Sequence, residues 1–130
     1  MKIVAVCGSF HKLEIEMMLE FAKSQASKHA IEIAEVVWVP GSMEVPLALD
    51  RLLPNYDAAI CLGIIEKGET QHGAAMGNAV IQSIIDLQIK HDKSIGLGII
   101  GPGAEPHHIG SRLEPHARAA VDAVFTMRQV

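Results

Sequence analysis

The stretches AAICLGII at residues 58–65 and SIGLGII at residues 94–100 decide the fold. Both are nearly continuous in apolar residues, as expected of strands that are buried on both faces of a parallel sheet. Two further strands are indicated by two more runs rich in β-branched residues, Ile3–Cys7 and Ile31–Val39. Each of the four runs ends at Gly, Pro or charged residues, so the sequence predicts four short strands.

Segments with a helical spacing of apolar residues follow the strands. They run from Lys12 to about Lys28, from Glu44 to Leu53, and from His72 to Lys90. Pro106 and Pro115 divide the remainder into two expected helical pieces, with Pro115 in the first turn of a last helix that reaches about Met127. This fourfold alternation predicts an α/β fold: a three-layer sandwich with a four-stranded parallel sheet, doubly wound and flavodoxin-like.

Composition limits the class of protein. A length of 130 residues suits one domain, 1–130. With 49% hydrophobic and only 20% charged residues the chain is not of the disordered class. The net charge of −4 offers no basic surface for nucleic acid, and the apolar runs are too short to cross a membrane. The first residues, MKIVAVCGSF, lack the long apolar core of a secretory signal, so a cytoplasmic protein is expected.

The expected helix 72–90 carries more apolar residues than one packing face requires. Its apolar residues are Ala74, Ala75, Met76, Ala79, Val80, Ile81, Ile84, Ile85, Leu87 and Ile89. One face can cover the sheet, and the surplus is better explained by a second copy of the chain than by burial within so small a domain. We therefore expect an oligomer.

Ligands of open parallel sheets bind beyond the carboxyl ends of the strands. The segments expected there are GSFH (8–11), WVPGSME (38–44), GIIEKGETQH (63–72) and IIGPGAEPHH (99–108). All four combine glycine with polar or aromatic residues. Any single glycine is equally well explained by a turn, but together the four segments predict one binding rim.

Three kinds of side chain in these segments suggest chemistry. Thr70 or Gln71 would begin the long helix, where free N–H groups favour an anion, although Thr70 could also simply cap the helix. Arg112 and Arg118 are the nearest guanidinium groups for a phosphate, with an unpaired surface role as the alternative for each. His72, at the helix start, is the best general acid or base.

Other sites are not expected. His107 and His108 could form a metal cluster with His116, but adjacent His side chains generally diverge and no Cys or carboxylate spacing supports one. His29 and His91 end helices and are expected in solvent. Cys7 and Cys61 are expected to be buried free thiols. There is no nucleophile elbow, no phosphate-binding P-loop and no complete dinucleotide fingerprint, so no cofactor and no metal are expected.

The loops also resemble a known family. SFH, VPGSMEVPLAL, LGIIEKGETQH, the IGPG stretch followed by Arg112, and the ending ARAAVDAV are similar to segments of the 6,7-dimethyl-8-ribityllumazine synthases, most of all the short archaeal-type members. The resemblance covers essentially the whole chain. It implies a transferase of riboflavin biosynthesis that condenses 5-amino-6-ribitylaminouracil with 3,4-dihydroxy-2-butanone 4-phosphate, releasing phosphate and water, and that works as a homopentamer, in some members within an icosahedral shell.

The resemblance also implies residue roles. Phe10 would stack on the pyrimidine and His11 would contact it, Ser42, Met43 and Glu44 would hold the ribityl chain, and Ile65 and Glu66 would line the ring pocket through backbone groups. Gly68, Glu69 and Thr70 would cradle the phosphate with Arg112, and His72 would be the general acid or base. Leu97 would reach a neighbour's site, and Arg118 matches a family Lys. His11 departs from the usual Asn.

Three other functions stay open. One is the archaeal-type riboflavin synthase paralogue, which would use two lumazine molecules and release no phosphate. Another is a flavin- or nucleotide-binding module of flavodoxin-like shape. The third is a shell protein without activity. The phosphate-binding residues Gly68, Glu69, Thr70 and Arg112 favour the lumazine synthase reaction.

Overall fold

The computed structural model describes residues 1–67 and 72–130. Four parallel strands form one sheet in the order β2-β1-β3-β4. The elements are β1 (Lys2–Gly8), α1 (Lys12–Lys28), β2 (Glu32–Val39), η1 (Ser42–Glu44), α2 (Val45–Leu52), η2 (Leu53–Asn55), β3 (Ala58–Glu66), α3 (His72–His91), β4 (Ile95–Ala104) and α4 (Pro106–Met127). The predicted doubly wound α/β sandwich is confirmed.

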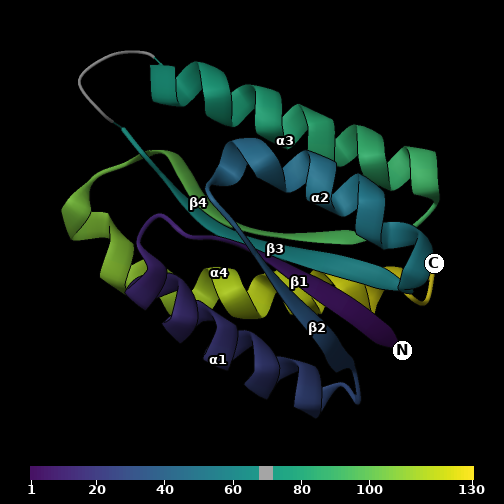
Figure 1. Ribbon diagram of the computed structural model, residues 1–130. Coiled ribbons are helices and arrows are strands. Elements are labelled where there is room, and N and C mark those ends of the chain that lie inside the picture. The colour runs from purple at the N-terminus through teal and green to yellow at the C-terminus, as the bar shows by residue number, and fades with distance from the viewer. Residues whose placement is uncertain (68–71) are drawn as a thin grey trace.

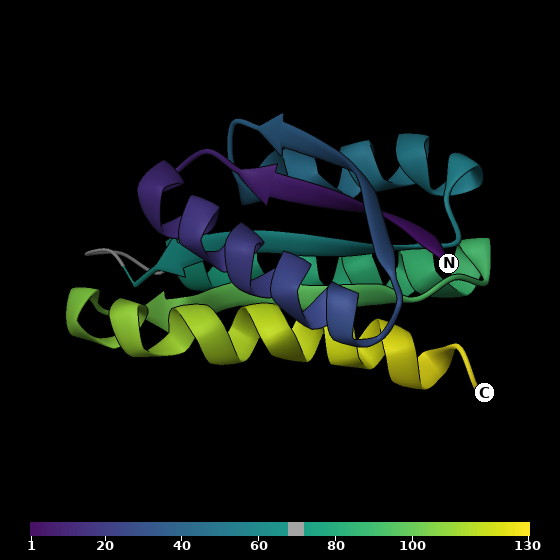
Figure 2. The same cartoon turned by 90° about the horizontal axis from the view of Figure 1, so that it is seen from below.

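The helices cover both faces of the sheet (Figure 1). Helices α1 and α4 lie on one face, and α2 and α3 lie on the other. All four strands point toward the same end of the molecule, where the turn into α4 and the start of α1 also lie (Figure 2). Both chain termini lie at the opposite end.

Aliphatic side chains fill both sides of the sheet. On the α1 and α4 side, Ile3, Ile60 and Leu62 pack against Met18 and Val121, all fully buried. Every residue of β3 from Ala58 to Ile65 is buried, as the continuous apolar pattern predicts. The two thiols are also confirmed as buried and free, and burial raises the pKa of each to about 12. Such thiols are protonated and poor nucleophiles at neutral pH.

Helix α4 differs from the sequence-based expectation. It is one continuous helix from Pro106 to Met127, with Pro115 inside it rather than at its first turn. Pro106 occupies that first turn instead. Proline costs a helix one backbone hydrogen bond, but Leu113 and Ala117 on either side of Pro115 are buried in the core. Their burial holds both halves of the helix on the sheet, so the proline does not divide it.

The expectation that His29 and His91 are solvated is also wrong. His29 Nε2 lies 2.8 Å from Asp122 Oδ1, and its ring stacks on Phe125 at 3.9 Å between centroids. His91 Nε2 lies 2.8 Å from Asp50 Oδ1. Hydrogen bonds lower the pKa of both carboxyl groups. Gln25 is the leading donor to Asp122, followed by His29, and Lys90 is the leading donor to Asp50, followed by His91. Both histidines therefore link a helix end to another element.

Helix α3 buries only part of its apolar surface. Gly77, Val80 and Ile84 face the core, whereas Ile85 and Ile89 are 43% and 77% exposed. None of the helices in the described part of the chain is both long enough and apolar enough to cross a membrane.

Candidate active site

The carboxyl ends of the four strands form a continuous rim of polar residues. The strand order changes direction between β1 and β3, because the chain moves from β1 outward to β2 and then returns to the other side of β1. Ligands of doubly wound sheets bind at this switch point. The rim predicted from the sequence therefore lies where the fold favours a binding site.

His11 and Glu66 meet at the switch point. His11 follows β1, Glu66 ends β3, and His11 Nε2 lies 2.7 Å from Glu66 Oε1. His11 has φ 60° and ψ 44°, in the left-handed region that His and Asn enter more readily than most residues. This backbone turn directs the chain from β1 into α1. The Glu66 side chain, and not only its backbone, thus belongs to the site.

Phe10 and Glu44 are neighbours across Gly41. A Cβ added to Gly41 would lie 3.1 Å from Phe10 Cδ2 and 3.6 Å from Glu44 Oε2, so both side chains pack against this glycine. The Gly41 N–H donates to Glu44 Oε2 at 3.0 Å. Phe10 is 72% exposed, which leaves ring surface for a flat ligand. Glu44, with acceptor capacity beyond one hydrogen bond, can also receive ligand hydroxyls.

The short helix η1 presents its residues differently. Ser42 is buried, with its Oγ 3.2 Å from the position that a Cβ on Gly63 would occupy. Met43 is 64% exposed. Ile65 is buried in the core on the α2 and α3 side, so only its backbone is available at the rim.

Arg112 lines a pocket of about 370 Å³ at the end of β4. The pocket is bounded by Ile100, Gly101, Pro102, Gly103, Ala104, His108, Arg112 and His116. Arg112 Nη1 donates to the His108 carbonyl oxygen at 3.0 Å. No carboxylate within residues 1–67 and 72–130 forms an ion pair with Arg112. Its positive charge is therefore available to an anionic ligand.

His116 shares the Arg112 pocket. Burial lowers the pKa of His116, and the neighbouring Arg112 charge lowers it further. A lowered pKa favours the neutral imidazole over the charged form. The stability tied to the neutral form is present above pH 6.5 and is lost as the pH falls through the lowered pKa. The sequence analysis considered His116 only as a partner of His107 and His108 in a metal cluster, and not as a neighbour of Arg112.

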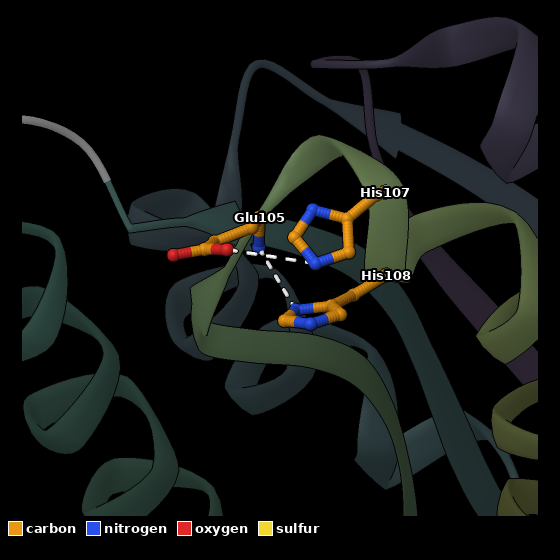
Figure 3. A group of neighbouring side chains, drawn as sticks. All are labelled: Glu105, His107 and His108. Atoms are coloured by element: carbon orange, nitrogen blue, oxygen red, sulfur yellow. Dashed lines mark hydrogen bonds and ion pairs between the residues drawn. The ribbon is translucent and has the colours of Figure 1, made fainter.

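Glu105, His107 and His108 form a cluster at the start of α4 (Figure 3). His107 Nε2 lies 3.6 Å from Glu105 Oε2, and the two His rings are 4.0 Å apart between centroids. The expectation that the adjacent His side chains diverge is wrong, and their third partner is Glu105 rather than His116. The other Glu105 oxygen lies 3.4 Å from Lys67 Nζ.

Glu105 was missed by the sequence reasoning, although a signal was present. In Glu105-Pro106-His107-His108, proline marks the first helical turn and places Glu105 at the N-cap. The N-cap faces the third helical residue, here His108, and the Glu105 N–H donates to His108 Nδ1 at 3.4 Å. Recognising the proline as a helix start would have brought these side chains together.

Two predicted site residues lie away from this rim. Leu97 is 38% exposed in β4, seven residues before Ala104 and hence about 23 Å from the strand end at 3.3 Å per residue. Arg118 joins α4 to α1: it donates to Gln25 Oε1 at 3.0 Å and to Glu114 Oε2 at 2.8 Å, and it lies over the Phe21 ring.

The predicted phosphate-binding residues Gly68, Glu69 and Thr70 lie outside the described residues, as does Gln71. His72 is exposed at the first position of α3. The helix therefore begins next to the segment that the sequence assigns to phosphate. A Cβ added to Gly73 would lie 2.7 Å from the Glu66 carbonyl oxygen, so this first turn is close to the end of β3.

A larger pocket, of about 740 Å³, lies at the opposite end of the molecule. Its lining includes Ile85 and Ile89 of α3 and Met127 at the end of α4. Its position is away from the carboxyl ends of the strands, and it contains none of the predicted site residues. We therefore place the candidate site at the rim, despite the smaller volume there.

Comparisons with known proteins show the family of this chain. Residues 1–130 match the model of the 6,7-dimethyl-8-ribityllumazine synthase family. A protein of that name from Staphylothermus marinus is 40% identical over 128 residues, covering 97% of this chain and 85% of the relative. A protein of the same name from Metallosphaera sedula is 35% identical, covering 97% of this chain and 85% of the relative. Another from Saccharolobus solfataricus is also 35% identical, covering 95% of this chain and 82% of the relative.

The match to the family model spans every element of the sheet and all four rim segments. The relatives share their printed name and cover nearly the whole chain. The chain belongs to the 6,7-dimethyl-8-ribityllumazine synthase family.

Proposed function

We propose that this chain condenses 5-amino-6-ribitylaminouracil with 3,4-dihydroxy-2-butanone 4-phosphate to give 6,7-dimethyl-8-ribityllumazine, phosphate and water. The observation that carries this proposal is the family match over residues 1–130, together with a rim that offers an aromatic ring and carboxylates near the switch point and a guanidinium at the end of β4. The riboflavin synthase paralogue and the non-catalytic alternatives are not favoured, because the relatives carry the synthase name.

The pyrimidine substrate would bind on the β1 and β2 side of the rim. Phe10 offers ring surface for stacking, and Glu44 lies beside it to accept hydroxyls of the ribityl chain. Ser42 and Met43 continue this surface along η1. The backbone of Ile65 and Glu66 would border the ring, with His11 held by Glu66 at the entrance to the switch point.

The phosphorylated substrate would bind where a helix start and a guanidinium supply positive charge. Gly68, Glu69 and Thr70 would contribute backbone and hydroxyl donors ahead of α3, and Arg112 would provide the charged hydrogen bonds. The lack of an ion pair to Arg112 in the described part of the chain supports this role. The neutral His116 in the same pocket adds a polar neighbour without competing for the anion.

His72 would move the protons. The amine of the pyrimidine attacks the ketone, and water leaves as the imine forms. Phosphate is then eliminated, and the resulting enol becomes a ketone. The second amine attacks this carbonyl, and a second water leaves as the ring closes. Each step transfers a proton, which the imidazole of His72 at the first turn of α3 can accept or return. Since both substrates are reactive, orientation supplies much of the rate and no metal or covalent nucleophile is required.

The site would be completed by a second subunit. Leu97 lies too far from its own rim to contact a ligand there, yet it is partly exposed at the sheet edge. A neighbouring chain would bring Leu97 of one copy toward the Phe10 side of another. We accordingly propose a homopentamer of single-domain subunits, acting in the cytoplasm.

The test is turnover with both substrates. The purified protein should form one lumazine and release one phosphate per cycle, followed by lumazine absorbance and by a phosphate assay in the same mixture. With lumazine alone it should form no riboflavin. Riboflavin from lumazine without phosphate release would favour the paralogue, and a bound yellow chromophore without turnover would favour a binding protein.

A further inference from the structure

The cluster of Glu105, His107 and His108 has the composition and spacing of a metal site. One ligand atom from each residue lies within 4.8 Å of the other two. In Figure 3 the two His rings and the carboxylate lie around one common space. It is the one cluster of three such ligands among residues 1–67 and 72–130.

We propose that Glu105, His107 and His108 bind a divalent cation of the zinc class. Zinc takes His nitrogen and carboxylate oxygen at about 2.0–2.2 Å in a tetrahedron, whose ligands are then about 3.4 Å apart. The 3.6 Å between Glu105 Oε2 and His107 Nε2 is close to that separation. Two His and one carboxylate leave a fourth position for water or for an anionic ligand.

Local hydrogen bonds prepare the ligands. Lys67 Nζ lies 3.4 Å from Glu105 Oε1, so the second oxygen, Oε2, is the one that faces His107. The Glu105 N–H donates to His108 Nδ1 at 3.4 Å, which occupies the lone pair of this nitrogen, so an ion would bind His108 through Nε2 after that nitrogen loses its proton, or would displace the N–H from Nδ1. The rings are inclined by 57°, which allows both to direct a nitrogen at one ion.

Two features limit the affinity. The positive end of the α4 dipole and the Lys67 ammonium both oppose a cation. His107 is also 70% exposed, so its side chain must be fixed on binding. Two imidazoles and one carboxylate also do not favour magnesium, because magnesium prefers oxygen ligands and retains its water. The site thus selects a cation that binds imidazole.

The experiment uses the full-length protein without an affinity tag, because added His residues would bind the same ions. Cobalt(II) is added while visible absorption is recorded, and zinc is titrated by calorimetry. We expect one ion per chain with the intense cobalt absorption of a tetrahedral site. His107→Asn and Glu105→Gln should each weaken binding at least about tenfold. Both side chains are partly or fully exposed, so these variants should fold normally.

His29→Asn is the matched control, since His29 also pairs with a carboxylate but has no third ligand atom beside it. It should bind cobalt as the unmodified protein does, and magnesium should not displace the ion. Absence of one-to-one binding, or equal binding by the unmodified protein and both cluster variants, would overturn the proposal. This test does not depend on catalytic activity.

Discussion

Arg112 differs from the carboxylates of the rim in having no charged partner among residues 1–67 and 72–130. Glu44 accepts from the Gly41 N–H, Glu66 pairs with His11, and Glu105 pairs with Lys67. These contacts satisfy each negative charge locally. At the scale of single residues, the rim is therefore suited to bind an anion at Arg112, and hydroxyls or ring edges elsewhere.

Replacing Arg112 by Ala should impair the reaction chiefly through the phosphorylated substrate. A charged hydrogen bond is worth about 1.5–3 kcal/mol, so kcat/KM for that substrate should fall by about 10- to 150-fold. Steady-state kinetics with each substrate varied in turn measures this. Arg51→Ala, in an exposed position on α2, serves as the control. A loss confined to the pyrimidine substrate would contradict the assignment.

His72→Ala should slow turnover by about ten- to a hundredfold, the low end of general acid–base effects, because the substrates already react in water. The variant should remain folded and oligomeric, and it should still bind a substrate analogue. Rates compared between pH 6 and 8 provide the measurement. A variant that matches the unmodified protein across this range would make His72 structural, and proton transfer would then fall to water or to the substrate phosphate.

The contacts of individual residues were only partly predictable. Repeated glycine and polar residues after each strand located the rim, because parallel strands all end at one edge. Partners such as His11 with Glu66, or Lys67 with Glu105, come from different loops and have no sequence pattern. His107 and His108 lie beside Glu105 because Glu105 is the N-cap of α4 and both His residues are in its first turn. The sequence indicates this arrangement only if Pro106 is recognised as the first helical residue.

At the scale of elements, the close packing of α4 on β4 holds the Arg112 pocket in place. Gly96 allows this approach: a Cβ there would overlap the backbone carbonyl of Ala120. The helix then runs from the rim toward the other end of the sheet. Its own residues Leu113, Ala117 and Val121 are buried in the core. The position of Arg112 thus depends on a contact far along the same helix.

Gly96→Ala should therefore destabilise the protein by about 3 kcal/mol or more, because backbone on both sides of the contact must move. Gly110→Ala is the control, since a Cβ at this helical position meets nothing within 4 Å. That variant should be stabilised by about 0.5–1 kcal/mol. Thermal unfolding at one fixed chain concentration compares them. Equal melting temperatures for the two variants would show that α4 is not held this closely.

The elements themselves were largely predictable, because buried parallel strands and amphipathic helices have different periodicities. All four strands and the first three helices were correctly anticipated. The prediction that Pro115 begins a separate helix was wrong for a physical reason. Helix propensity includes the backbone hydrogen bond that proline removes, but it does not include the burial of Leu113 and Ala117, which outweighs that loss.

At the scale of the whole molecule, exposed apolar surface remains on α3 and at the rim. Ile85 and Ile89 border the larger pocket, and Phe10 and Leu13 are exposed at the start of α1. Contiguous apolar surface of this kind is typical of interfaces. A second subunit at these surfaces would cover them and would complete the proposed site.

The purified protein should therefore sediment as an oligomer, and the proposed homopentamer would be five copies of the 14.0 kDa chain. Ile89→Lys should weaken the assembly, because an unpaired charge would be buried in the interface. Analytical ultracentrifugation at micromolar concentration measures both. A stable monomer of the unmodified protein at that concentration would exclude an active site shared between subunits.

We propose that the reaction takes place at the carboxyl ends of the strands. A crystal structure of the protein with an unreactive pyrimidine analogue and inorganic phosphate tests it most directly. We predict the ring on Phe10, the ribityl chain beside Ser42 and Glu44, and the phosphate between the start of α3 and Arg112. Binding of the analogue in the pocket of about 740 Å³ at the opposite end, beside Ile85 and Met127, would contradict the account.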